Sequence, residues 1–181
     1  LLLAKLSAYG FDRRIIILIG SYLSNRKQRT KVGSELSLWL DIIIGVPQES
    51  VLGPLLFNIF INDLMYITQY SSICYFADDN TIYCCNNNIL DLNNTLRNEV
   101  LVFLEWFENN QLAANPDKFQ LMYLGYRLNN FDTLPKISLS HVEIKPKTSV
   151  KLLGVTLDNK LNFNEHVNNI CKVAIQNTNC L

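Results

Sequence analysis

Two adjacent carboxylates, Asp78 and Asp79, are the residues of this chain with the clearest capacity for chemistry. They lie at a turn between two short apolar runs, residues 72–75 and 81–84. Their like charges repel, so each resists ionising beside the other unless a cation is near. Mg2+ prefers carboxylate oxygens and needs few protein ligands where substrate phosphates complete its shell. Two such ions can hold both oxygens of a displacement at phosphorus. The alternative is a plain hairpin turn, because Asp and Asn are common turn residues.

Composition allows one domain with a hydrophobic core, since 49% of the 181 residues are hydrophobic. The 16 basic and 16 acidic residues balance, which weighs against a strongly basic nucleic-acid binder but leaves a local basic patch open. The five cysteines lack the spacing of a disulfide framework, so we expect reduced thiols and no disulfide-linked partner. Cys74 and Cys84 are expected to be small core residues. No apolar run reaches roughly 18 residues, so no contact with a membrane is expected.

Hydrophobic periodicity and turn residues predict an α+β fold in which the Asp pair sits on a hairpin. The helix that starts near Pro54 is apolar almost all round, so we expect it to be buried. The predicted helices are 1–9, 12–23 with Asp12 as its cap, 54–64, 91–108 and 164–176. The predicted strands are a hairpin turning at Gly33-Ser34 with its return strand at 36–44, the hairpin of the Asp pair, 119–124, a short hairpin at 137–144, and 150–157.

Five ordered blocks carry a resemblance to a known family. They are Gly45 to Phe57 with Ile61-Asn62-Asp63-Leu64, then Phe76-Ala77-Asp78-Asp79, then Trp106-Phe107 through Lys118, then Val150 to Val155, then Phe163 with His166. Together they resemble the palm of a reverse transcriptase encoded by a non-LTR (LINE-like) retrotransposon. The resemblance implies an antiparallel sheet with a catalytic β-hairpin packed on helices. Residues 1–181 would be one partial domain, from after the first catalytic strand through the primer grip to the start of the thumb connection.

The resemblance also implies the activity of an RNA-directed DNA polymerase, a metal-dependent nucleotidyl transfer. Its cofactor would be Mg2+ in a two-metal site. Its partners would be an RNA template, a DNA primer and deoxynucleoside triphosphates, with an intracellular location in nucleus or cytoplasm. The family's further metal-binding Asp lies upstream of Leu1, so we expect the metal site, the N-terminal part of the palm and the fingers to be incomplete here.

By resemblance, each candidate residue has a role and a plainer alternative. Asp78 is the better candidate for direct contact with the metal ion, and Asp79 would be a weaker ligand. Lys118 would act on the leaving pyrophosphate, or is a solvated surface lysine. The remaining assignments are Pro47, Gln48, Phe76 and Ala77 in the template–nucleotide pocket, Leu153 and Gly154 in the primer grip, and Arg26, Lys27 and Arg29 on nucleic-acid phosphates. The basic residues could instead protect a solvated hairpin edge.

One departure from the family bears on activity. The family has Gly where this chain has Glu49. Glu49 adds bulk and a negative charge facing a polyphosphate, and two unit charges about 4 Å apart repel by roughly 4 kcal/mol at an effective dielectric near 20. Phe119 also replaces a small polar residue. These changes predict a decayed or partial copy of a mobile element. The alternatives are a non-catalytic RNA- or DNA-binding remnant of the same fold, or a plain α+β domain.

Overall fold

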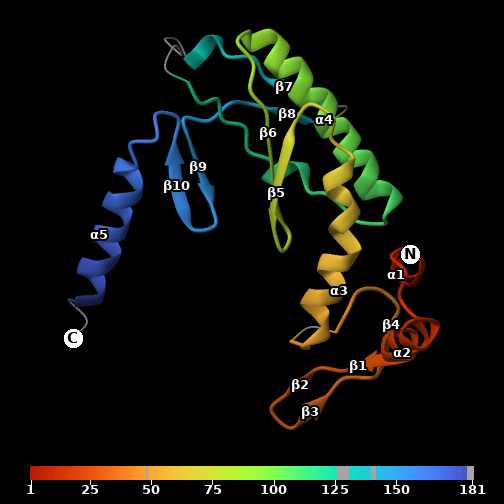
Figure 1. The fold of residues 1–181 in the computed structure, drawn as a ribbon. Coiled ribbons are helices and arrows are strands. Elements are labelled where there is room, and N and C mark those ends of the chain that lie inside the picture. The colour runs from red at the N-terminus through yellow and green to blue at the C-terminus, as the bar shows by residue number, and fades with distance from the viewer. Residues whose placement is uncertain (48, 126–130, 140–141, 179–181) are drawn as a thin grey trace. The chain divides into compact units, whose positions relative to one another are not determined.

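The computed structural model describes residues 1–47, 49–125, 131–139 and 142–178, so Gln48 lies outside the described residues. The chain separates into two units, Leu1–Tyr66 and Ile67–Leu181. Each unit is built from local pairs of elements (Figure 1).

In the first unit, helices α1 (Leu2–Ala8), α2 (Arg13–Leu23) and α3 (Leu52–Ile61) are followed by the 3-10 helix η1 (Asn62–Tyr66). Asp12 caps α2 as predicted, since its carboxylate accepts a hydrogen bond from the Arg14 amide at 2.8 Å. The Lys5 ammonium donates to the Asp63 carboxylate and to the Phe60 carbonyl, both at 2.7 Å, and so joins α1 to the end of α3. The buried apolar side chains of this unit are Leu6, Leu56, Ile61 and Leu64.

The prediction that α3 is buried all round is wrong for its first turns. Gly53 and Leu56 are buried, but Leu52 and Leu55 keep 39% and 54% of their surface exposed. Helix α1 contacts α3, and η1 continues the chain directly from its end. An apolar sequence shows that a helix can be buried; how many neighbours cover it is decided by the tertiary structure.

The predicted hairpin of the first unit is confirmed, with its turn at Gly33-Ser34. Strand β1 (Arg26–Gln28) pairs with β4 (Leu40–Ile42), and β2 (Lys31–Val32) pairs with β3 (Glu35–Leu36). The return strand is interrupted: Gln28 pairs with Leu40 and Lys31 with Leu36, so residues 37–39 stand opposite residues 29–30. Three residues against two is a β-bulge, which bends a strand and redirects its side chains.

The second unit carries the Asp-pair hairpin as predicted. Strand β5 (Ser72–Phe76) pairs with β6 (Asp79–Tyr83), and the long helix α4 (Ile89–Asn109) follows, capped by the Asn88 side chain. The later elements are η2 (Pro116–Lys118), η3 (Phe131–Thr133), β7 (Ile137–Leu139) with β8 (Val142–Ile144), β9 (Ser149–Leu152) with β10 (Val155–Asp158), and α5 (Asn164–Thr178). The α+β class is confirmed. Within the described residues each sheet has two strands, so no continuous sheet forms there.

The core of the second unit packs α4 against the β7–β8 hairpin. Leu121, Tyr123, Ile137 and Ile144 are buried, and Leu92 and Leu96 of the α4 stripe pack on them. The predicted strand 119–124 is wrong, because Leu121 makes an isolated bridge to Pro146, which has no N–H to extend a ladder. The predicted single strand 150–157 is also wrong. It is the β9–β10 hairpin, folded at Leu153-Gly154, where both residues have positive φ, +47° and +85°.

The prediction that Cys74 is a core residue is wrong. Along β5, Ser72, Cys74 and Phe76 are exposed while Ile73 and Tyr75 are partly buried, so one face of the strand is uncovered. Cys84 is partly buried. Burial is the largest cause that raises the pKa of its thiol, and the nearby Cys85 and Glu99 raise it further. The four described cysteines are free thiols. Across the described part of the chain, no helix is both long and apolar enough to cross a bilayer.

Tyr123 gives a pH-dependent prediction. Its hydroxyl contacts the Asn93 side-chain oxygen at 2.7 Å and the Pro135 carbonyl at 3.1 Å. Burial, with a smaller effect of Cys84, raises its pKa from 10.0 to about 12. A raised pKa favours the protonated folded form, so this contribution to stability is complete below pH 10 and is lost as the pH rises toward 12.

We therefore expect the free energy of unfolding of Tyr123→Phe to fall less steeply over that alkaline range than that of the unchanged chain. Urea titrations at a series of pH values measure this difference. Tyr66→Phe, at an exposed tyrosine, is the matched control and should keep the slope of the unchanged chain. Equal slopes for Tyr123→Phe and the unchanged chain would contradict the assignment.

Candidate functional site

The Asp pair lies at the tip of the β5–β6 hairpin. Phe76 pairs with Asp79, so Ala77 and Asp78 form a two-residue turn. Ala77 has φ +53°, a positive angle of the kind that tight hairpin turns require at their first central residue. The side-chain amide of Asn80 donates a hydrogen bond to the Asp78 backbone carbonyl at 3.0 Å and closes the turn. The local sequence therefore holds two exposed carboxylates side by side.

Neither carboxylate has an ion-pair partner within the described residues. There, too, no group of three His, Cys, Asp or Glu side chains is placed to hold a metal ion. A cation at this turn would therefore take two carboxylates from this hairpin and its other ligands from elsewhere. That donor set fits Mg2+, which binds through one or two carboxylates together with water and substrate phosphates.

Asn80, which the sequence indicated only as a turn residue, also belongs to this site. Its side-chain oxygen is buried and accepts no hydrogen bond in the described structure, although its amide nitrogen holds the turn. Buried acceptors without a donor are uncommon and costly. The Asp-Asp-Asn sequence carried a signal for this role, because an Asn side chain often bonds to backbone two residues away.

Glu99 supports the hairpin by holding the segment that precedes β5. The sequence analysis did not identify this residue. Only 6% of its surface is exposed although it carries a carboxylate. That carboxylate accepts hydrogen bonds from the amides of Gln69 at 3.2 Å and Tyr70 at 3.1 Å, and from the Ser71 hydroxyl at 2.9 Å. It thereby ties α4 to the segment that enters β5. The signal in the sequence was an acidic residue three positions after Leu96 and four before Phe103, on the apolar stripe of α4.

The loop before α3 is fixed around Ser50. The Ser50 hydroxyl donates to the Pro47 carbonyl at 2.7 Å and accepts from the Gly53 amide at 3.0 Å. A Cβ on Gly53 would lie 2.9 Å from the Pro47 oxygen, so Gly is required there. Glu49 is exposed and has φ +55°, a conformation that favours Gly and strains a residue with a side chain.

The other candidate residues lie on turns. Lys118 ends η2 and is exposed, and Leu153 and Gly154 form the exposed turn of β9–β10. Phe76 keeps 67% of its surface exposed. Within the described part of the second unit, no hydrogen bond or ion pair joins Lys118 or Gly154 to the Asp pair. The structure thus groups Phe76, Ala77, Asp78 and Asp79 at the tip of one hairpin.

The three basic candidates differ in their surroundings. The Arg26 guanidinium is partly buried and donates to the carbonyls of Leu23, Ile44 and Gly45, so it fastens the loop before Pro47. Lys27 forms an exposed ion pair with Asp41 at 3.3 Å. The Arg29 guanidinium lies over the Trp39 ring, 4.5 Å from its centroid.

Asp158 organises the entry to α5. Its carboxylate accepts from the amides of Lys160, Asn162 and Phe163, at 3.0, 3.1 and 2.7 Å, and these bonds lower its pKa. Farther along α5, the His166 ring accepts from the Thr156 amide at 3.3 Å. The residues at 163 and 166 are therefore fastened to β10.

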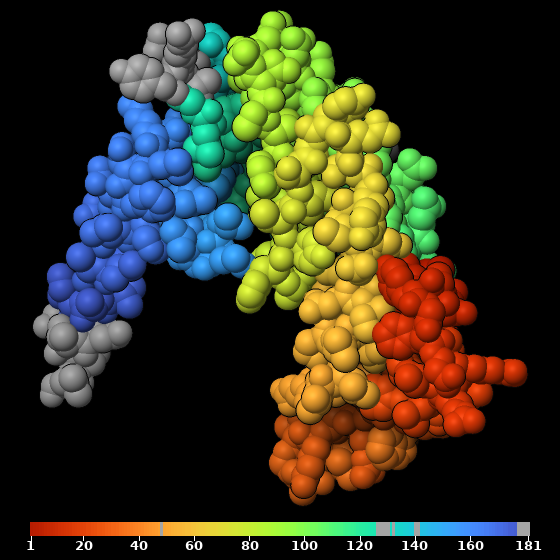
Figure 2. Space-filling view, in the orientation of Figure 1, coloured from red at the N-terminus to blue at the C-terminus, as the bar shows by residue number. Residues whose placement is uncertain are grey.

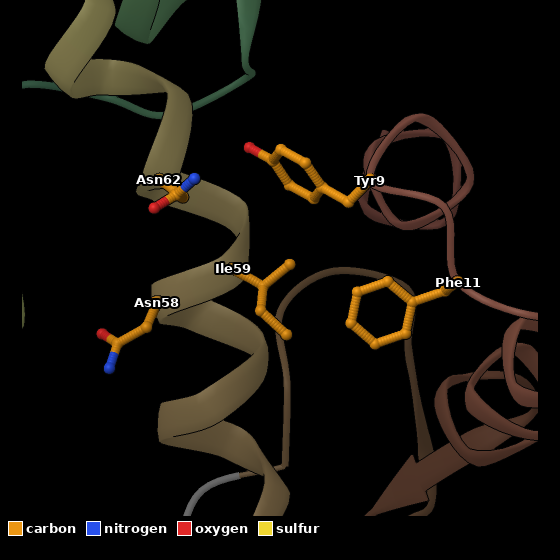
Figure 3. Close-up of a pocket in the computed structure, with 5 residues that line it drawn as sticks. All are labelled: Tyr9, Phe11, Asn58, Ile59 and Asn62. Carbon is orange, nitrogen blue, oxygen red and sulfur yellow. The ribbon is translucent and has the colours of Figure 1, made fainter.

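A cavity of about 330 Å³ lies in the first unit (Figure 3). It is lined by Tyr9 and Phe11, which follow α1, and by Asn58, Ile59 and Asn62 on α3 and η1. Figure 3 shows Ile59 pointing toward the two aromatic rings. Among the described residues that line it, the polar groups are the Asn58 and Asn62 amides and the Tyr9 hydroxyl, and none is charged.

The comparisons with known proteins decide the family. The family model for reverse transcriptase (RNA-dependent DNA polymerase) matches residues 2–157. The chain belongs to the reverse transcriptase family. The resemblance to a reverse transcriptase is therefore confirmed. The match covers the Asp-pair hairpin of this reverse transcriptase segment and the β9–β10 turn, and it ends before the block of Phe163 with His166. Reverse transcriptases as a family generally use divalent metal ions.

Curated relatives come from insect retrotransposons. The segment is 30% identical over 167 residues to the RNA-directed DNA polymerase from mobile element jockey of Drosophila melanogaster, covering 88% of this chain and 18% of that protein. It is 29% identical over 157 residues to the probable RNA-directed DNA polymerase from transposon X-element of the same species, with 84% and 17% covered.

A third relative is the retrovirus-related Pol polyprotein from type-1 retrotransposable element R1 2 of Nasonia vitripennis. The identity there is 26% over 128 residues, covering 68% of this chain and 31% of that protein. The segment therefore spans less than a third of each of these relatives. No solved structure matches it significantly.

Proposed function

We propose that this chain is the catalytic-hairpin part of the palm of an RNA-directed DNA polymerase from a non-LTR retrotransposon. The observation that supports this best is the β5–β6 tip, where two exposed carboxylates have no ion-pair partner in the described structure. Such a pair favours a cation, and nucleotidyl transfer needs cations where phosphate charge develops. Residues 1–181 would form one partial domain of the larger polymerase.

Asp78 and Asp79 would hold Mg2+ together with phosphate oxygens of the substrate. The ions would supply charge neutralisation at the phosphorus under attack. The protein's own contribution is to keep the two carboxylates fixed, through the Ala77 turn and the Asn80 bond to the Asp78 carbonyl. Asp78 would be the stronger ligand, because it lies in the turn itself, and Asp79 the weaker.

The substrates would be an RNA template, a DNA primer and deoxynucleoside triphosphates. Phe76 and Ala77 beside the metal, and Pro47 and Gln48 in the loop before α3, would line the template–nucleotide pocket. Lys118 would neutralise the leaving pyrophosphate. Leu153 and Gly154 would let the primer backbone approach, since a Gly turn leaves room that a side chain would fill.

A chimeric polymerase tests this function. Residues 2–157 replace the matching segment of the jockey polymerase, and primer extension on an RNA template is measured with Mg2+. We expect extension with Glu49 in place, and more efficient extension once Glu49 is changed to Gly. A folded chimera that binds template and primer but gives no extension with Glu49→Gly would contradict the proposal.

A second candidate function is nucleic-acid binding without catalysis. The specific observation that favours it is Glu49, a negatively charged residue held at φ +55° in the loop assigned to the nucleotide. In that case the chimera with Glu49 intact would bind the RNA–DNA hybrid and would not extend it. Binding and extension measured on the same preparation separate the two functions.

Glu49→Gly gives a prediction of its own. Removing the Glu49 charge should lower the KM for nucleotide by about tenfold or more. This holds even if the repulsion between that charge and the nucleotide's phosphates is only half of the roughly 4 kcal/mol expected at about 4 Å. Glu49→Gln separates the causes, because it removes the charge and keeps the side chain at positive φ. An unchanged KM in both variants would show that Glu49 lies away from the nucleotide.

A further inference from the structure

The β1–β4 hairpin carries a set of side chains that the proposed function does not explain. Lys27 stands opposite Asp41 in the β1–β4 ladder and forms an ion pair with it. Arg29 and Trp39 lie just beyond the paired residues, and the Arg29 guanidinium contacts the Trp39 ring. Lys27 and Trp39 line one cavity. Figure 2 shows the hairpin segment in orange as an exposed surface.

Trp39 is unusually open for a tryptophan. Its exposed fraction is 56%, whereas the other tryptophan, Trp106, is 8% exposed. The β-bulge formed by residues 37–39 immediately precedes β4 and sets the direction of the Trp39 side chain. The Arg29 guanidinium stacks on the ring at 4.5 Å and orients the indole without burying it. More than half of this large flat ring is therefore left open by the described residues of its own unit.

A shallow cavity of about 390 Å³ adjoins this ring. It is lined by Trp39, Lys27 and Asn25, and Arg29 is not among the described residues that line it. The cavity thus combines an aromatic surface, an ammonium group and an amide. Lys27 is paired with Asp41 at 3.3 Å, but both side chains are more than half exposed, at 59% and 69%, so the pair is weak and exchangeable.

We propose that the Trp39 face, defined by Asn25, Lys27, Arg29 and Trp39, binds an unpaired nucleotide of a single-stranded nucleic acid. The base stacks on the exposed indole, the Lys27 ammonium meets the adjoining phosphate, and Arg29 adds positive charge beside the ring. Aromatic stacking combined with a basic groove is the general way in which proteins hold single strands without reading sequence. A base inside a duplex cannot offer its face to the indole, so the ligand is single-stranded.

This inference rests on the proposed function, because it names the form of nucleic acid that the polymerase segment holds on its first unit. The experiment is therefore run on the full chain without nucleotides and with a chelator, so that no polymerisation is required. Oligothymidylate and oligouridylate are titrated while tryptophan fluorescence is recorded. Stacking on Trp39 should quench that fluorescence. In Trp39→Phe, the remaining buried Trp106 should show no quenching.

The variants give the size of the effect. Trp39→Ala should weaken binding roughly 5- to 150-fold, which is the range expected for the loss of one stacked base. Trp39→Phe keeps a smaller ring and should lose less. Lys27→Ala should keep the quenching and reduce the slope of log affinity against log salt by about 0.7, the change expected for one phosphate contact on a single strand. Circular dichroism of each variant establishes that it is folded.

Three outcomes would overturn the inference. They are Trp39→Ala binding single strands as tightly as the unchanged chain, blunt duplex binding as well as single strands, and self-association, seen in sedimentation, that covers Trp39. Trp39-dependent binding by a chain whose chimera never extends a primer would leave this inference intact and contradict the catalytic function alone.

Discussion

Asp78→Asn in the jockey chimera should lower kcat for primer extension by about 10²–10³-fold. The reason is electrostatic: the substitution removes one of the two charges that hold cations at the reacting phosphate, and losing a single preorganised stabilising group typically costs this much. The side chain keeps its size, and the Asn80 bond is made to the Asp78 backbone carbonyl, so the turn should persist. The measurement is single-turnover extension at saturating nucleotide.

Three comparisons sharpen that prediction. Asp79→Asn should reduce kcat by less, if Asp79 is the weaker ligand. Asp91→Asn is the matched control, because Asp91 is another exposed carboxylate of the same unit, in the first turn of α4, and it should leave kcat unchanged. Mn2+ binding by the free chain, followed by electron paramagnetic resonance, should weaken in Asp78→Asn. If Asp78→Asn and Asp91→Asn extend primers equally fast, the metal role of the hairpin is wrong.

Glu99→Ala should lower the free energy of unfolding by about 2–3 kcal/mol. The substitution leaves the Gln69 and Tyr70 amides and the Ser71 hydroxyl without their acceptor, and an unsatisfied buried donor costs about 1–3 kcal/mol. Water can reach part of this segment, since Gln69 and Tyr70 are exposed residues, which limits the loss. Urea denaturation followed by circular dichroism measures it.

Glu105→Ala is the control for helix propensity, because Glu105 is an exposed residue of the same helix and should change stability by less than about 0.5 kcal/mol. Glu99→Gln keeps one acceptor oxygen, so its free energy of unfolding should lie between those of Glu99→Ala and Glu105→Ala. Because Glu99 fastens the entry to β5, Glu99→Ala should also weaken Mn2+ binding at the Asp pair. Equal stability of Glu99→Ala and Glu105→Ala would remove the supporting role assigned to Glu99.

Much of the site could be predicted because it is local. A two-residue turn between two β-rich runs is encoded within about ten residues of sequence, since turn chemistry fixes the register of a hairpin. The Asp78–Asp79 hairpin, the Asp12 cap and the Gly33-Ser34 turn were therefore found from the sequence. The wrong predictions concern burial and pairing: the exposure of Leu55 and Cys74, and the unpaired segment around Leu121. Both depend on which neighbours pack against a segment.

The sequence by itself determined the chemistry of the site, because residue types and spacing place two carboxylates at one turn and mark the family. Only the tertiary structure decided what holds and surrounds that chemistry. Glu99 reaches back about 30 positions to the base of β5, and Arg29 stacks on a tryptophan across a bulge. Such contacts join residues far apart in the chain, and their strength depends on burial and geometry, which no local pattern specifies.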